Sequence, residues 1–447
     1  GGTANVQDIY PLAPLQAGIL FHHLAAGAGD PYVLQAQFAF ASTERLQAFA
    51  QALQGVIERN DILRSAVLWE GLEQPLQVVW RQAPLCCEEI ALEPGDGEVL
   101  GQLQARFDSR RYRLDIAQAP LLRLVHAADP VNQRVVALLL FHHLVMDHVA
   151  LEVLQHELQA FLLGQQQRLG EAVPYRNYVA QARLGIGEAE HEAFFRQMLG
   201  DIDQPTLPLG LQEVPGGSAE LSEARQPLDR LLSRRLRLQA RQLGVSAASL
   251  MHLAWGRVLG SLAGQQQVVF GTVLLGRMQG GEGAERALGV FINTLPLRVD
   301  LGELPVREAL LATHERLAQL LGHEQAPLAL VQRCSGVEPG TPLFSSLLNY
   351  RHSAPAANQA GQADSAWEGM QLLNAQERSN YPLTLSIDDL GDGFMLTAVA
   401  AGIDARRICD YLHGTLEQLL LALQQQPEQA IGQVPVLPQA ERRQVLE

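Results

Sequence analysis

The chain has 447 residues, of which 47% are hydrophobic and 18% charged, as in a globular protein large enough for two lobes of ordinary domain size. Its 33 basic and 48 acidic residues give a net charge of -15, and we expect no basic run or basic helix face to offset it. This balance excludes a general nucleic-acid binder. Lysine is absent, so no lysine can form a Schiff base or serve in a phosphate-binding loop.

Cysteine usage and the apolar runs indicate an intracellular protein. The four cysteines show no CxxC spacing, so neither a zinc ribbon nor a thioredoxin-type pair is indicated. The opening GGTANVQDIYPL lacks the basic end and apolar core of a signal peptide. The longest apolar run, VVALLLF at 135–141, is typical of a buried strand and too short to span a membrane. We therefore expect a cytoplasmic protein.

A helix with clear periodicity follows Ser42 and Thr43, which are suited to cap it. After RNDILRSAVLWE, where the pattern changes to that of a strand, two strands are predicted at 120–129 and 133–143, joined by a turn at DPVN. The apolar face of the helix recurs at steps of three and four residues and comprises Leu46, Phe49, Ala50, Leu53, Val56 and Ile57.

A further helix is predicted from near Val149 to a stop at Gly164. The stretch FHHLVMDHV, residues 141–149, therefore lies at a junction of strand, loop and helix, where side chains can leave the core and face a cleft. The apolar stripe of this helix comprises Leu151, Leu154, Leu158, Phe161 and Leu162.

The second half of the chain is predicted to be another α+β unit. The polar segment 164–177 precedes it, residues 203–220 are rich in Pro and Gly, and residues 353–366 have the composition of a surface loop. The tail from Pro427 is typical of a linker that leaves the fold. Helices are expected at roughly 229–243, 246–262, 306–322 and 404–425, and strands near 267–274, 290–299, 343–350, 382–388 and 393–401.

Three interpretations of FHHLVMDHV compete. In the structural one, His142 and His143 continue the alternation of the strand. In the metal one, His143, Asp147 and His148 supply ligands for iron or zinc, although adjacent histidines on a strand point apart. In the catalytic one, a histidine at the strand end accepts a proton or holds an amine or hydroxyl, since its ordinary pKa is about 6.5. Asp147 then braces the loop, and Arg64 is its candidate partner.

Seven segments in order resemble the condensation domains of non-ribosomal peptide synthetases, which share the chloramphenicol acetyltransferase-like fold. FHHLVMDH resembles the family's HHxxxDG motif. The other six segments are DIYPLAPLQAGILFHH (8–23), RNDILRSAV (59–67), PYRNYVAQ (174–181), FGTVLLGR (270–277) with LGVFINTLPLRV (288–299), HEQAPLALV (323–331) and TPLFSSLLNY (341–350).

The resemblance implies an α+β fold of two acetyltransferase-like lobes that form a V-shaped pseudo-dimer with a tunnel between them. We expect the lobes at 1–175 and 176–430, and a linker toward a following adenylation domain at 431–447. Donor and acceptor carrier domains would deliver substrates on phosphopantetheine arms, and the domain itself would bind no cofactor, no metal, no nucleic acid and no membrane. We expect a monomeric domain excised from a larger bacterial synthetase.

The resemblance also assigns roles to individual residues. His143 falls on the catalytic histidine of the motif, His142 on the histidine that is usually structural, and Asp147 with Arg64 on a bracing ion pair. His148 replaces the motif glycine, whose backbone N–H has been suggested as a donor to the oxyanion. Asn349, near the end of a predicted strand, is a candidate substrate or tunnel residue, or else an ordinary strand-end asparagine.

Related domains of the same fold offer alternative functions. The intact histidine pair argues against heterocyclization. An epimerization domain and a non-catalytic module that recruits an oxidase stay open as alternatives to peptide-bond formation. The opening segment resembles subtypes that take a D-configured donor more than the ordinary L-donor type.

Overall fold

The computed structural model describes residues 2–438 and 441, apart from residues 26, 28, 93, 94, 96, 213–220, 277–285, 353–364 and 377–380. The chain forms two compact units, which confirms the expected two-lobed α+β architecture. Unit 1 comprises Gly1–Gly185, Leu275–Ile292 and Asn358–Arg378, and unit 2 comprises Ile186–Leu274, Asn293–Ala357 and Ser379–Glu447. This division differs from the predicted lobes at 1–175 and 176–430: unit 1 continues to Gly185, and two later segments of the chain also belong to it.

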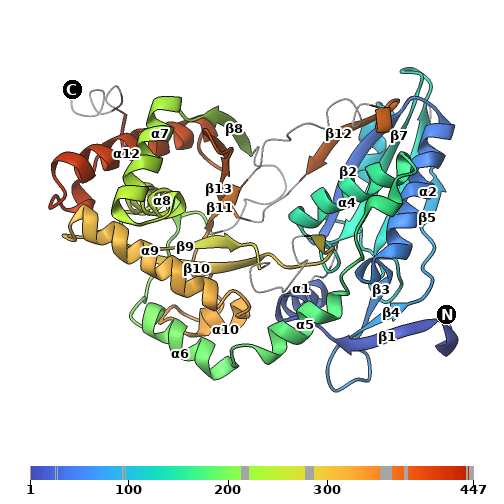
Figure 1. Ribbon diagram of the computed structural model, residues 1–447, viewed down its shortest axis with the longest axis horizontal. Helices are drawn as coiled ribbons and strands as arrows, with labels where there is room; N and C mark the ends of the chain where they lie inside the picture. Colours follow the sequence, from blue (N-terminus) through green and yellow to red (C-terminus); the bar gives the residue numbers. More distant parts are fainter. Residues whose placement is uncertain are drawn as a thin grey trace. The chain divides into compact units, whose positions relative to one another are not determined.

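Unit 1 contains a five-stranded sheet in the order β12-β2-β7-β6-β5 and a three-stranded sheet in the order β1-β4-β3 (Figure 1). The strands are β1 (Val6–Pro11), β2 (Val33–Phe40), β3 (Ser65–Leu68), β4 (Leu76–Trp80), β5 (Cys86–Glu89), β6 (Leu122–Asp129), β7 (Arg134–His142) and β12 (Met370–Gln376). The helices are α1 (Pro14–Ala25), α2 (Thr43–Arg59), α3 (Val99–Arg106), α4 (His148–Leu162) and α5 (Tyr175–Leu184).

The central strand β7 is buried on both faces, which explains its continuous apolar run. Ala137, Leu139 and Phe141 pack into a core with residues of α2 and α4. The alternate residues, among them Leu138 and Leu140, pack into a second core that α3 helps to close. A strand held from both sides provides a rigid base for the residues that follow it.

The predicted helix cap at Ser42 is confirmed. The Ser42 side chain accepts a hydrogen bond from the Arg45 amide at the start of α2, and the predicted apolar face of α2 is buried except for Ala50, which is half-buried. Strand β12, by contrast, was not predicted. It pairs antiparallel with β2, with Met370 opposite Phe40, although these residues lie far apart in the sequence. The short segment MQLLNAQ shows no period that would identify such a partner.

Unit 2 is built on a six-stranded sheet in the order β10-β9-β11-β13-β14-β8. Its strands are β8 (Ser222–Pro227), β9 (Gln267–Leu274), β10 (Asn293–Asp300), β11 (Ser346–His352), β13 (Leu383–Asp389) and β14 (Phe394–Ala400). Its helices are α6 (Glu188–Leu199), α7 (Arg230–Leu243), α8 (Ala247–Ala263), α9 (Val306–Gly322), α10 (Leu328–Arg333) and α12 (Ala405–Gln425). All four helices and five strands predicted for this region are present, whereas α6, α10 and β8 were missed. No helix within the described ranges combines the length and apolar character needed to cross a membrane.

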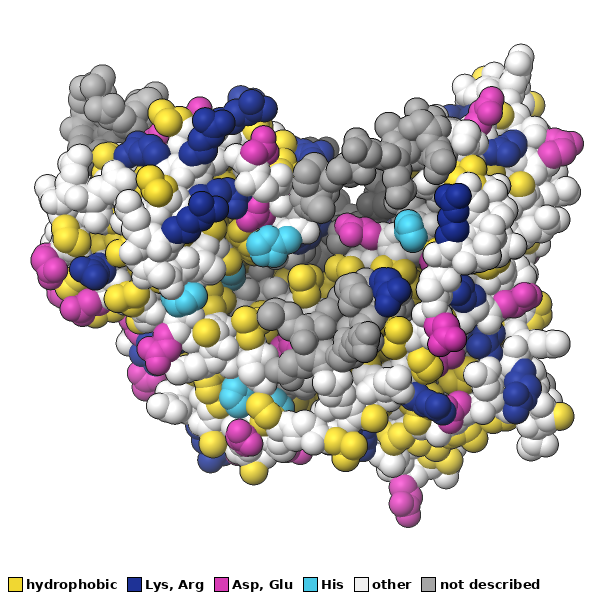
Figure 2. Space-filling view, in the orientation of Figure 1, with side chains coloured by type: hydrophobic (Ala, Val, Ile, Leu, Met, Phe, Trp, Pro, Cys, Tyr) yellow, Lys and Arg dark blue, Asp and Glu magenta, His cyan; other side chains and the backbone are white. Residues whose placement is uncertain are grey.

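Two features of unit 2 differ from the predictions. Helix α7 carries five arginines, and leucines and other residues between them keep the arginines from forming a run in the sequence. In the view of Figure 2, arginines gather over α7 and α12. The arginines of α7 are Arg230, Arg234, Arg235, Arg237 and Arg241.

The expected linker begins later than residue 431, since Ile431, Val434 and Val436 are buried in the core of unit 2.

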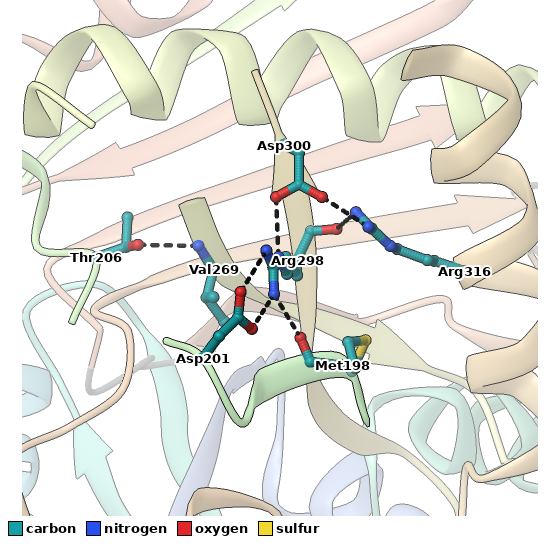
Figure 3. A network of polar contacts seen from close by, with 7 residues as sticks. All are labelled: Met198, Asp201, Thr206, Val269, Arg298, Asp300 and Arg316. Atoms are coloured by element: carbon teal, nitrogen blue, oxygen red, sulfur yellow. Dashed lines mark hydrogen bonds and ion pairs between the residues drawn. The ribbon is translucent and has the colours of Figure 1, made fainter. Parts of the chain in front are cut away.

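A network around Arg298 joins three elements of unit 2 (Figure 3). The Arg298 guanidinium donates to both carboxylate oxygens of Asp201, to Asp300 and to the carbonyl of Met198 at the end of α6. Arg316 on α9 donates to the other oxygen of Asp300 at 2.6 Å and to the carbonyl of Arg298 at 3.1 Å. Arg298 belongs to the LGVFINTLPLRV segment, and its contacts here are structural.

Candidate functional site

The histidine pair lies where β7 ends, as the sequence predicted. His142 is the last residue of β7 and is fully buried, whereas His143 is half-buried. The backbone N–H of His143 donates to the carbonyl of Tyr32 at 2.8 Å, which continues the pairing with the neighbouring strand β2. Adjacent strand residues point to opposite sides, so only one of the two rings lies within the core.

His142 belongs to a buried cluster that the sequence analysis missed. Its Nε2 lies 2.8 Å from Asp30 Oδ2, and Nδ1 of His23 lies 2.5 Å from the same oxygen. Nδ1 of His142 accepts the backbone N–H of Leu144 at 3.0 Å, so Nε2 carries the ring proton and donates it to Asp30. The predicted structural role of His142 therefore has a specific partner, the carboxylate of Asp30.

Burial and hydrogen bonding set the ionisation of this cluster. Burial lowers the pKa of His142, and the nearby Asp30 offsets this effect only in part. Burial also acts to raise the pKa of Asp30, but hydrogen bonds from His142, His23 and the Tyr32 amide outweigh it and hold the pKa well below its usual range. Near neutral pH the cluster therefore combines an ionised carboxylate with a neutral His142.

The same contacts disfavour a metal ion at His23, Asp30 and His142, whose ligand atoms all lie within 4.8 Å of one another. A metal at Nε2 of His142 requires a lone pair at the atom that here carries the proton, because Nδ1 already accepts from Leu144. The distances of 2.5 and 2.8 Å are those of hydrogen bonds between the ligand atoms themselves. We interpret the cluster as a hydrogen-bonded support.

Asp147 is fully buried and joins the loop to a second segment of unit 1. One carboxylate oxygen accepts the Ala150 amide at 2.8 Å and caps helix α4. The other accepts the amides of Phe291 and Ile292 at 2.8 and 3.1 Å. The predicted bracing role of Asp147 thus operates through backbone N–H groups of LGVFINTLPLRV. Because both oxygens are engaged, the metal set of His143, Asp147 and His148 gains no support.

The segment that Asp147 binds is itself tightly held. Gly289 has φ +151, and a Cβ at this position would lie 2.4 Å from the ring of Tyr175. The Tyr175 hydroxyl donates to the carbonyl of Val290 at 2.7 Å, and the Asp147 amide donates to the carbonyl of Gly289 at 3.2 Å. The glycine of this motif is therefore required for close packing beside Asp147.

The predicted ion pair between Arg64 and Asp147 is wrong. Arg64 is buried at the end of a 3-10 turn, where its Nε donates to the carbonyl of Ile57 at 3.2 Å and its Nη1 to Gln7 at 2.6 Å and to the carbonyl of Trp80. These contacts engage Nε and Nη1 of Arg64, and among the described residues no ion pair joins Arg64 to Asp147. The physical reason is that backbone carbonyls and amides solvate the two charges separately.

The remaining candidates fall in three different environments. Nδ1 of His143 is buried and has no hydrogen-bond partner within the described part of the chain, and such an unsatisfied polar atom requires an explanation. His148 is the first residue of α4, so its backbone is helical, while its side chain lies outside the described atoms. Asn349 lies in β11 of unit 2, opposite Ser386, and its Oδ1 is also buried without a partner among the described residues.

His23 and Asp30 could not be recognised from the sequence. HH at 22–23 and GDPY at 29–32 are short polar stretches in a region without strong periodicity, and nothing in their spacing connects them with residue 142. His23 lies on α1 and Asp30 precedes β2, and only the placement of these elements around β7 brings the three side chains together.

Comparison with known proteins identifies the family. The sequence profile described as "Condensation domain" matches residues 6–446. This chain belongs to the condensation-domain family. It is 49% identical over its whole length to part of malpinin synthetase of Mortierella alpina and 31% identical to part of a linear gramicidin synthase polypeptide of Brevibacillus parabrevis, and it spans 6% of each of these relatives. A condensation domain does not imply a bacterial source, since Mortierella is a fungus.

Solved structures agree on the fold of this condensation domain. The first condensation domain of the CDA synthetase matches with a TM-score of 0.68 at 16% identity, over 97% of this chain and 100% of that one. The X-domain described in complex with OxyB from teicoplanin biosynthesis matches with a TM-score of 0.70 at 18% identity, over 98% and 97% of the two chains. At these identities the likeness establishes the fold alone.

Proposed function

We propose that this domain forms peptide bonds in non-ribosomal peptide synthesis. The amine of an acceptor aminoacyl group attacks the thioester carbonyl of a donor aminoacyl or peptidyl group, so that a C–N bond forms and a C–S bond breaks. The donor arm leaves as a thiol, and the lengthened peptide stays on the acceptor arm. Both substrates arrive on phosphopantetheine arms of carrier domains, and the domain itself binds no cofactor.

The observation that carries this proposal is the position of His143. Its ring follows a strand buried on both faces, its backbone is bonded to Tyr32, and its Nδ1 has no partner among the described residues. The attacking amine must be deprotonated, and His143 either takes its proton or orients its lone pair. A thioester is already activated, so correct orientation alone supplies much of the rate, on the order of 7–11 kcal/mol for well-aligned reactants.

The backbone N–H of His148 is the group we assign to the oxyanion. His148 opens helix α4, and the first N–H groups of a helix have no acceptor within the helix. The partial positive charge at the same end stabilises a developing anion. Histidine in place of the motif glycine keeps this donor. Asp147 supports it indirectly, because its carboxylate caps the same turn through Ala150.

The parts of the synthetase outside this chain are also proposals. We expect an upstream donor carrier, a downstream acceptor carrier and an adenylation domain that follows the tail, with the linker beginning after the buried Val436. The opening segment favours a D-configured donor. Asn349 is retained as a candidate contact to substrate, because the Oδ1 atom is buried and unbonded among the described residues.

The test combines the domain with separately loaded donor and acceptor carriers and detects the peptide on the acceptor by mass spectrometry. His143→Ala should lower the rate by about 100- to 10,000-fold, the usual contribution of a positioned acid or base. His156→Ala is the matched control, since His156 is an exposed histidine on α4. The donor is supplied as both epimers in competition.

Three outcomes contradict the proposal. A wild-type rate of peptide formation by His143→Ala would show that His143 takes no part in the reaction. If an epimerised amino acid appears on a carrier and no peptide forms, the chain is an epimerization domain. If carriers bind but neither product forms, it is a non-catalytic module.

A further inference from the structure

Asp30 is a buried carboxylate that receives hydrogen bonds from three directions. It lies in the short connection between α1 and β2 and is 0% exposed. Oδ2 accepts from His23 at 2.5 Å and from His142 at 2.8 Å, and Oδ1 accepts the amide of Tyr32 at 2.9 Å. A buried anion is tolerated only with such partners, so the cluster is held together as a unit.

Two of these contacts lead directly to His143. His142 precedes it in the chain, and the carbonyl of Tyr32 accepts its backbone N–H at 2.8 Å. The Tyr32 ring also meets the His143 ring edge to face, with centroids 6.3 Å apart. A single carboxylate therefore holds both the covalent neighbour of His143 and the residue that binds its backbone and packs against its ring.

The cluster is anchored to the rest of unit 1 as well. The Asp30 amide donates to the carbonyl of Ser109 at 2.7 Å, and its carbonyl accepts the amide of Val33 at 3.1 Å. Arg113 donates to the backbone carbonyl of His23 at 2.6 Å. Asp30 and His23 are therefore held in place by contacts that do not involve β7.

We propose that Asp30, with His23 as its second donor, is the positioning residue that orients His143. Asp30 does not contact substrate. It holds the His142 ring in place and fixes the conformation of Tyr32, and so sets the position of the His143 ring. This inference rests on the proposed function, because His143 must take part in the chemistry for its orientation to affect the rate.

The primary test compares Asp30→Asn with Asp129→Asn. Asn has the same shape as Asp but presents an NH2 group to one of the histidine donors. Asp129 is also buried, bonded to Arg134 and Asn132 at the opposite end of the β6–β7 hairpin, and is the matched control. In the condensation assay, Asp30→Asn should lower kcat on the order of 10- to 100-fold with little change in KM, as expected for a misplaced catalytic group. Asp129→Asn should leave kcat within about 3-fold of wild type.

A second readout follows the rings themselves. With ¹⁵N-labelled histidine, NMR should show the wild-type His142 protonated at Nε2, and Asp30→Asn should change the ¹⁵N shifts of both His142 and His143. His23→Asn retains a short N–H donor and should keep most of the rate, whereas His23→Phe has no donor and should lower kcat by roughly 10-fold. This pair keeps the test informative should Asp30→Asn fold poorly.

The inference is overturned when Asp30→Asn and His23→Phe leave kcat and the His143 resonances at their wild-type values. It is also overturned when the Asn and Phe variants of His23 are equally impaired, since this would indicate a packing role alone. The proposed function fails separately, through His143→Ala with unchanged activity. In that case the NMR measurements still report whether Asp30 controls the His143 ring.

Discussion

Each of the two units contains a polar cluster built on aspartates, and the clusters differ in burial and in the partner of the acid. In unit 1, Asp30 is completely buried and is bound by two histidines. In unit 2, Arg298 binds Asp201, whose side chain is 61% exposed, and Asp300, which is 28% exposed (Figure 3). Arginine stays charged at all accessible pH values, whereas histidine changes its charge near neutrality.

The two clusters should therefore respond differently to mutation and to pH. The Arg298 network joins α6, β10 and α9, and partly exposed ion pairs of this kind tolerate the loss of one partner. The Asp30 cluster depends on the tautomer and charge of each ring, and it lies directly behind the candidate catalytic residue. A fully buried network has more to lose, because any member left unpaired costs its full desolvation free energy.

The largest expected effect comes from deleting one carboxylate in each cluster. Asp30→Ala should lower the free energy of unfolding by about 3–5 kcal/mol, because two buried histidine donors and the Tyr32 amide lose their acceptor. Asp201→Ala should lower it by less than about 1 kcal/mol, since its side chain is largely exposed. Urea unfolding of both variants measures the two values. Equal losses would remove the distinction between the clusters.

A smaller effect is expected from the pH dependence of stability, which in unit 2 involves a buried histidine whose partners are neutral. Burial lowers the pKa of His252 on α8 to about 4, and its partners, the carbonyl of Ala248 and the Thr272 hydroxyl, are neutral. The unfolded chain, with a histidine pKa of about 6.5, binds more protons between these values, so stability falls as pH drops through this window. Between pH 7 and 5 this residue should account for about 2 kcal/mol of the loss.

The His252 prediction is tested by urea unfolding of His252→Gln at both pH values. The variant should lose about 2 kcal/mol less than wild type on going from pH 7 to pH 5. His156→Gln, at an exposed position on α4, should show the wild-type difference. A His252→Gln profile parallel to that of wild type would show that His252 titrates normally in the folded protein.

The smallest expected effect is the coupling between Arg64 and Asp147. In a double-mutant cycle with Arg64→Met and Asp147→Asn, the interaction free energy should be below about 0.5 kcal/mol, because the two side chains have separate partners. Arg237 and Asp389 in unit 2 form a two-point ion pair at 2.5 and 3.1 Å and serve as the positive control, with a coupling of about 1–3 kcal/mol. An interaction free energy of this size between Arg64 and Asp147 would show that the two side chains do form an ion pair.

Local regularities in the sequence were sufficient for much of the fold. The cap at Ser42, the apolar face of α2, the strand–loop–helix junction at His143 and most elements of unit 2 follow from short-range patterns of period two or 3.6. The arginines of α7 were missed because leucines and other residues separate them in the sequence. Strand β12 was missed because its pairing with β2 joins segments far apart in the chain.

The candidate site divides in the same way. Sequence patterns were enough to place His143 at the end of a buried strand and Asp147 at the start of the helix after it, and to identify the family by its motifs. The partners emerged only from the folded chain: Asp30 and His23 for His142, the Phe291 and Ile292 amides for Asp147, and backbone carbonyls for Arg64. The difference is one of range, because capping and periodicity act between near neighbours in the chain, whereas a buried charge takes whichever hydrogen-bonding group the fold brings to it.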